Sequence, residues 1–212
     1  MFFFSNVYGY MRSADLATTL RIIMIFAAAY LLLVKPQYYA VAVFLIIVSF
    51  ALDFVDGYLA LGRKHNFFSY LSSEARGIKT YTKKDTEKLP KYGSAFDIAG
   101  DRITEYVLWL AFTFTGIVPI FVIFVIVTRN ALSDAFTLSM KKNFHAMHSK
   151  FGKIASSHIS RGIYGTTKAL MFVYLSLIYA LNLPLDIGYA LIGIVVTYSL
   201  LRGAAEIYEA LS

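Results

Sequence analysis

Six long apolar stretches, separated by short polar segments, constrain this chain more than any other feature of its sequence. A hydrocarbon core about 30 Å thick requires roughly 20 apolar residues in a helix that crosses it. Only 16% of the residues are charged and 58% are hydrophobic, whereas soluble domains carry about 25% charged residues. We therefore predict an all-α integral membrane protein with six transmembrane helices. The helices are expected at about 16–34, 38–61, 93–114, 119–140, 164–181 and 187–205.

The distribution of basic residues predicts the orientation of these helices. The polar stretches 63–92 and 141–161 are rich in Lys and Arg. The three short turns between the other segments contain one basic residue, Lys35. Cytoplasmic loops carry such an excess, so both long loops and both termini are expected in the cytoplasm. The alternation accounts for the net charge of +7 and gives no reason to expect nucleic acid as a partner. The expected organisation is an interfacial segment at 1–15 and one domain at 16–212, with a long cytoplasmic insertion at 61–92.

Four aspartates lie near the ends of two predicted membrane helices. Asp53 and Asp56 are three residues apart at the end of the second helix, and Asp97 and Asp101 are four apart at the start of the third. Residues three or four apart share one face of a helix, and both of these helix ends lie on the cytoplasmic side. Ionisable residues inside a membrane are costly and mark functional sites. The two pairs are therefore predicted to face each other near the cytoplasmic boundary.

A cluster of four carboxylates requires cations, because like charges in a medium of low polarity repel strongly. Oxygen ligands alone suit Mg²⁺ or Mn²⁺, and the chain has no cysteine for a thiolate site. Gly57 and Gly93 lie beside the two pairs and would let a nucleotide approach the helix backbone. The alternatives are ion pairs with Lys or Arg and a proton path, which give the two glycines no role. We favour a phosphate-binding metal site.

The combined pattern resembles the signature of the CDP-alcohol phosphotransferases, also called CDP-alcohol phosphatidyltransferases. That signature is D-x2-D-G-x2-A-R, a spacer, and G-x3-D-x3-D. The chain departs from it at two points. Leu61 occupies the position of the signature arginine, for which Arg63 or Lys64 is the candidate replacement, and the spacer is far longer than usual. The matching residues are Asp53, Asp56, Gly57, Ala60, Gly93, Asp97 and Asp101.

The resemblance implies an activity and a set of roles. Members of this family displace CMP from a CDP-lipid by a polar alcohol, and the donor here would be of the CDP-diacylglycerol or CDP-archaeol type. Two ions, Mg²⁺ or Mn²⁺, are implied, with Asp101 also acting as the catalytic base. A homodimer in the cell membrane with its site facing the cytoplasm is implied as well. The metal ligands would be Asp53, Asp56, Asp97 and Asp101, and the nucleotide contacts Asp53, Gly57, Ala60, Arg63, Gly93 and Asp97.

Three basic residues in the later helices are candidates for the acceptor site. Arg129 lies in the fourth predicted helix, and Arg161 and Lys168 share a face at the start of the fifth. Cationic side chains bind phosphate groups, although anchoring at the inner membrane surface explains the same residues. Their distribution resembles the inositol-phosphate branch of the family, so inositol phosphate is the preferred acceptor, with glycerol phosphate or serine as the alternative. The alternative from another class of protein is a cation pathway lined by the aspartates.

Overall fold

The computed structural model describes residues 13–60, 91–139 and 158–211. The chain divides into two compact units. The first comprises residues 1–74 and 78–108, and the second comprises residues 75–77 and 109–212. Within the described ranges the chain forms six α-helices and one short 3₁₀ helix, so the predicted all-α architecture with six long helices is confirmed.

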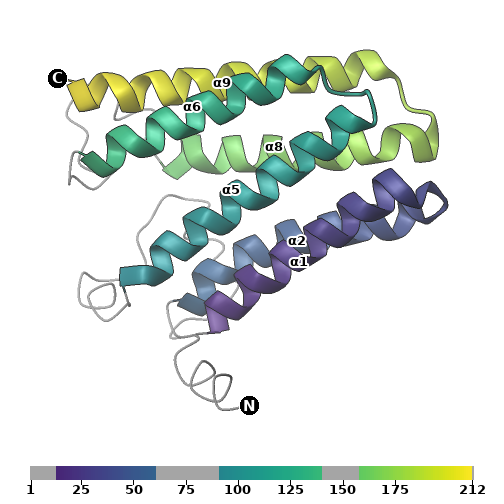
Figure 1. The fold of residues 1–212 in the computed structure, drawn as a ribbon, viewed down its shortest axis with the longest axis horizontal. Coiled ribbons are helices and arrows are strands. Elements are labelled where there is room, and N and C mark those ends of the chain that lie inside the picture. The colour runs from purple at the N-terminus through teal and green to yellow at the C-terminus, as the bar shows by residue number, and fades with distance from the viewer. Residues whose placement is uncertain (1–12, 61–90, 140–157, 212) are drawn as a thin grey trace. The chain divides into compact units, whose positions relative to one another are not determined.

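The first unit is built on a helical hairpin. Helix α1 (Ser13–Val34) and helix α2 (Tyr39–Ala60) lie side by side and are joined through the 3₁₀ helix η1 (Pro36–Tyr38) (Figure 1). Ala28 of α1 and Ala42 of α2 are both completely buried. Small side chains at such positions let two helices pack closely without a cavity. The third part of this unit is the N-terminal portion of helix α5 (Lys91–Phe114), as far as Leu108.

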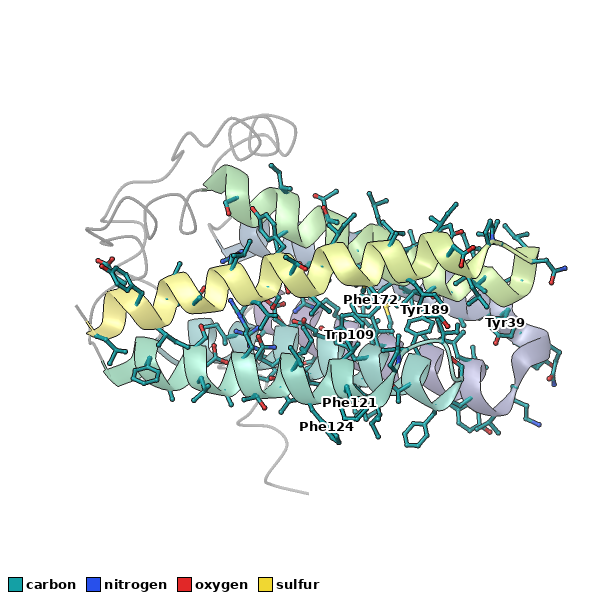
Figure 2. All side chains as sticks on the ribbon, turned by 90° about the horizontal axis from the view of Figure 1, so that it is seen from above. Tyr39, Trp109, Phe121, Phe124, Phe172 and Tyr189 are labelled. Carbon is teal, nitrogen blue, oxygen red and sulfur yellow. The ribbon has the colours of Figure 1, made fainter. Side chains whose placement is uncertain are left out.

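The second unit contains the end of α5 and three further helices. These are α6 (Ile120–Ser139), α8 (His158–Leu181) and α9 (Leu185–Leu211). Aromatic rings fill its interior: Trp109 meets the edge of Phe172 at a centroid distance of 5.1 Å (Figure 2). Phe121 and Phe124 instead point outward from α6 and are 72% and 57% exposed. Large apolar groups on an outer face are typical of a surface that contacts lipid.

Two short turns end their helices with the same backbone motif. Gly116 after α5 has a φ of 79°, and Asn182 after α8 has a φ of 50°. In each turn the following residue reaches back to a carbonyl of the last helical turn, from Ile117 to Phe112 and from Leu183 to Ile178, both at 3.1 Å. A glycine or asparagine in the left-handed region followed by this hydrogen bond is the usual way to end a helix. Both turns lie where the sequence predicts them.

Two of the helices extend beyond their predicted limits. Helix α8 begins at His158 rather than near residue 164, and α9 continues to Leu211 rather than ending near residue 205. The added turns carry polar and charged residues, which a search for apolar stretches excludes. Much of the predicted interfacial segment at 1–15 and nearly all of the insertion at 61–92 lie outside the described residues.

The length and composition of the helices agree with a membrane protein. Two spans, Asp15–Val34 and Leu185–Glu209, are long and apolar enough to cross a bilayer. Tyr39–Asp53 and Gly162–Ile178 are shorter apolar helices. The number of crossings and the direction of insertion remain predictions from the sequence.

Candidate active site

A buried arginine of α1 joins two of the four predicted aspartates. The Arg21 side chain is 2% exposed, and its Nη1 pairs with Oδ1 of Asp53 on α2. Its Nη2 donates a hydrogen bond to Oδ1 of Asp101 on α5. A guanidinium group presents its N–H donors in a planar fork and can therefore bind two carboxylates at once. The first unit thus brings one aspartate from each half of the motif onto a single positive charge.

A close approach between α5 and α1 positions Asp101. Gly100 is buried, and a Cβ atom on it would overlap Cγ2 of Thr18 on α1. Since glycine alone leaves this space open, the backbone of α5 can lie against α1 one residue before the aspartate. Thr104 also donates its hydroxyl hydrogen to the backbone carbonyl of Asp101 at 3.0 Å. The carboxylate therefore extends from a backbone that packing holds in place.

The other predicted site residues take their places on the same helices. Asp97 lies one turn before Asp101 on α5 and is exposed. Asp56, Gly57 and Ala60 follow Asp53 in the last turns of α2, and Gly93 lies in the first turn of α5. The structure describes only the backbone of Asp56, Gly57, Ala60 and Gly93. Arg63 lies outside the described residues. Among the described residues, no group of three His, Asp or Glu is placed to hold a metal ion.

The chemistry of the Asp53 and Asp101 carboxylates nevertheless fits a divalent ion. Their side chains are 44% and 48% exposed, so a solute can reach them. One oxygen of each converges on the same cationic group, and hard carboxylate oxygens are the ligands that Mg²⁺ and Mn²⁺ prefer. Two helices therefore present oxygen donors of the right type close enough together to share one cation.

Arg21 is a site residue that the sequence reasoning missed. It is the only charged residue between positions 16 and 34, inside an apolar helix. A lone arginine in such a helix is expensive and normally faces a partner. That signal was available in the sequence. The partners of Arg21 could not be predicted from the sequence, because Asp101 lies 80 positions away along the chain.

A second polar network lies inside the second unit, around Arg129 of α6. Arg129 donates from Nε to the backbone carbonyl of Ser199 at 2.8 Å and from Nη1 to Oδ1 of Asn130 at 2.9 Å. Its Nη2 pairs with Oε2 of Glu206 on α9 at 3.3 Å, and both side chains are over 90% buried. Gly203 provides the space, since a Cβ atom there would lie 2.6 Å from Arg129 Nε. The network fixes the arginine between α6 and α9.

Lys168 of α8 belongs to the same network through an aromatic ring. The Lys168 Nζ and the Arg202 Cζ each lie 5.3 Å from the centroid of the Tyr164 ring. Arg202 also pairs with Oε1 of Glu206 at 3.8 Å. Two of the three predicted acceptor residues, Arg129 and Lys168, are thus connected through residues of α8 and α9. The side chain of the third, Arg161, is not among those described.

The sequence reasoning named neither Arg202 nor Glu206. Both lie in the C-terminal part of α9, and Glu206 follows the predicted end of the last helix. Their spacing of four residues, one basic and one acidic, is the signal that could have found them, because such pairs share a helix face.

Comparison with known proteins supports the resemblance in the N-terminal part of the chain. Residues 11–74 match the model of a family described as CDP-alcohol phosphatidyltransferase. The matched segment includes α1 and α2, and therefore Arg21, Asp53 and Asp56, whereas Asp97 and Asp101 lie beyond it. No curated protein and no solved structure matches the chain.

The described helices and the paired aspartates are consistent with a membrane protein that has an acidic site. The match covers less than half of the chain, and it shows that this N-terminal part is similar to enzymes of the CDP-alcohol phosphatidyltransferase family. Such enzymes transfer a phosphoalcohol group from a CDP-linked donor and release CMP, and they generally use a divalent metal.

Proposed function

We propose that this protein makes a phospholipid by displacing CMP from a CDP-lipid with a polar alcohol, in a reaction that needs Mg²⁺ or Mn²⁺. The observation that supports this most directly is the convergence of Asp53 and Asp101 on one cation. These two residues come from the two halves of the family signature. The matched segment includes the first half and supports the same assignment.

The four aspartates would hold two divalent ions. Asp53, Asp56 and Asp97 would act as ligands, and Asp101 would complete the site. When bound, the ions would neutralise the diphosphate and stabilise the departing phosphate. Because the donors are carboxylate oxygens on facing helices, the donor set suits these ions and gives no preference for zinc.

Asp101 would also be the catalytic base. Its carboxylate takes the proton of the acceptor hydroxyl, and the resulting oxygen attacks the lipid-side phosphorus of the donor. A new phosphorus–oxygen bond forms as the bond to CMP breaks, and CMP leaves with the electron pair. A base must come within hydrogen-bonding distance of the proton that it removes. The exposure of the Asp101 side chain, 48%, permits that approach.

The nucleotide would rest on the glycine-containing ends of α2 and α5. Gly57, Ala60 and Gly93 lack bulky side chains, so the cytidine diphosphate could approach the backbone there. Asp53 and Asp97 would contact the nucleotide as well as the metal. Arg63 would replace the contact that the signature arginine makes, since Leu61 occupies that position.

The acceptor is proposed to be a phosphorylated alcohol, with inositol phosphate preferred. Three cationic side chains, Arg129, Arg202 and Lys168, lie in one network with Glu206. Cationic side chains bind phosphate groups, so these residues favour an anionic ligand. Arg161, which the sequence spacing predicts on the same helix face as Lys168, would add a fourth charge. Glycerol phosphate fits the same chemistry, whereas serine would leave these charges without a role.

The remaining parts of the proposal follow from the sequence. The enzyme would cross the cell membrane with its site towards the cytoplasm and would act as a homodimer. The outward-facing phenylalanines of α6 support contact with lipid.

The test is CMP release by the purified protein in liposomes that contain CDP-diacylglycerol or CDP-archaeol. Inositol phosphate, glycerol phosphate, serine and inositol are supplied separately, with Mg²⁺, Mn²⁺ or a chelator. The expected result is release with a phosphorylated acceptor and a divalent ion, abolished in Asp101→Asn. The control is Asp186→Asn, which removes an exposed carboxylate from the first turn of α9. Ion flux without CMP release under any condition would support a cation pathway instead.

A further inference from the structure

We infer that Arg21 is a built-in counter-cation, which holds Asp53 and Asp101 before a divalent ion binds and competes with that ion for the same two carboxylates. The inference rests on the proposed function. It adds a residue of α1 to a site that the family signature places on α2 and α5.

Arg21 is buried and therefore depends on a counter-charge. Its side chain is 2% exposed in an apolar helix. A buried arginine without a counter-charge is strongly disfavoured, so Arg21 depends on these carboxylates. The dependence is mutual, because two carboxylates on facing helices repel each other unless a cation lies between them.

Arg21 contacts one oxygen of each carboxylate. Arg21 uses Oδ1 of Asp53 and Oδ1 of Asp101, with one guanidinium nitrogen for each. A divalent ion that bridges α2 and α5 needs oxygens of the same two carboxylates. It also carries positive charge, so it repels the guanidinium at that position. Arginine and ion therefore stabilise the same pair of carboxylates but oppose each other's binding.

The packing of the helices decides the sign of the effect. If Arg21 alone held the carboxylates together, its loss would separate them and weaken ion binding. Gly100 of α5, however, lies directly against Thr18 of α1, and Ala28 and Ala42 are buried on the faces of α1 and α2. These contacts involve neither the guanidinium group nor the carboxylates, so they remain when Arg21 is replaced. Removing Arg21 should therefore strengthen ion binding, because the competitor is lost while the geometry remains.

The experiment measures Mn²⁺ binding to the purified protein, without substrates, from the electron paramagnetic resonance signal of unbound Mn²⁺. Arg21→Gln should bind Mn²⁺ about tenfold more tightly than the wild type, the factor expected when two half-exposed ion pairs no longer compete. Lys35→Gln removes an exposed positive charge at the end of α1 and should bind like the wild type. Arg21→Lys keeps a cation without the fork, so its affinity should lie between the two.

A second measurement separates competition from a merely structural role. Without metal, Arg21→Gln should unfold at a lower temperature than the wild type, and Mn²⁺ should raise its unfolding temperature by more than it raises that of the wild type. If Arg21 has a structural role alone, Arg21→Gln should lower the unfolding temperature by the same amount with and without Mn²⁺. Its Mn²⁺ affinity should then be unchanged or reduced.

Three results would overturn the inference in distinguishable ways. If the wild type binds Mn²⁺ but Arg21→Gln binds it no more tightly than Lys35→Gln does, the competition is rejected and the metal site is kept. No Mn²⁺ binding by the wild type or any variant rejects the proposed metal site and the inference together. If Arg21→Gln does not fold, Arg21→Lys decides, and an affinity no tighter than wild type rejects the competition.

Discussion

Glu206→Gln tests the buried network of the second unit. Glu206 accepts from Arg129 at 3.3 Å and pairs with Arg202 at 3.8 Å, and its side chain is 7% exposed. The amide removes the negative charge but keeps the shape and one acceptor oxygen. Of the partners that Arg129 has among the described residues, the neutral groups Ser199 O and Asn130 Oδ1 would then remain beside its buried positive charge.

The magnitude follows from this change in charge. Removing one partner of a buried ion pair costs about 3–5 kcal/mol. The amide oxygen still accepts a hydrogen bond from Arg129, and such a bond to a charged group contributes about 1.5–3 kcal/mol. We therefore expect Glu206→Gln to lower the free energy of unfolding by about 2 kcal/mol, and we expect Arg129→Gln combined with it to cost less than the two single changes added together.

The assay is reversible unfolding in mixed micelles, with increasing SDS, followed by the fluorescence of the single tryptophan. Trp109 is completely buried against Phe172 in the same unit as the network. Asp186→Asn is the matched control, because it makes the same carboxylate-to-amide change at an exposed position of α9. If Glu206→Gln unfolds at the same SDS fraction as this control, or if the double variant is additive, the buried pair does not stabilise the unit as argued.

Three further changes follow from other features. Gly100→Val should reduce CMP release about 100-fold, because the side chain must displace Thr18 and with it the backbone that carries Asp101; Gly193→Val, where a Cβ meets nothing within 4 Å, should have little effect. Lys168→Met should raise the KM for inositol phosphate about tenfold and leave the KM for the CDP-lipid unchanged, which initial rates at varied acceptor would show. Asn182→Val should cost about 1–2 kcal/mol in the SDS titration because its φ of 50° disfavours a branched side chain, while Asn182→Gly should not destabilise the protein.

The sequence predicted the helices well where apolar residues dominate. The first three begin or end within a few residues of the predicted positions, and the turns at Gly116 and Asn182 fall between helices that the sequence predicts. The polar ends of α8 and α9 were missed, because hydrophobicity defines the membrane core and not the full length of a helix. Glu206 fell outside the predicted last helix for that reason.

The site could be predicted only as far as local spacing reaches. Motif spacing placed Asp53 and Asp101 on the helix ends that the structure brings together at one cation. It could not indicate that the cation would be Arg21, because the pairing depends on how α1 packs against α2 and α5. Neighbours in the sequence were a poor guide: Arg102, next to Asp101, pairs with Glu105 of its own helix at 3.8 Å.

The turns at Gly116 and Asn182, which are closed by backbone hydrogen bonds, limit where a label or extra residues can be inserted into this protein. At Gly116 and at Asn182 the peptide groups that end the helix are satisfied by the chain itself. A bilayer offers no water to an unpaired peptide group, so a turn of this kind can lie at the lipid boundary without solvent. An epitope or fluorescent tag inserted there would open the backbone ring and expose carbonyls that the present turn conceals. Insertions at these two hairpins should therefore fail in a membrane even where they would be tolerated in water.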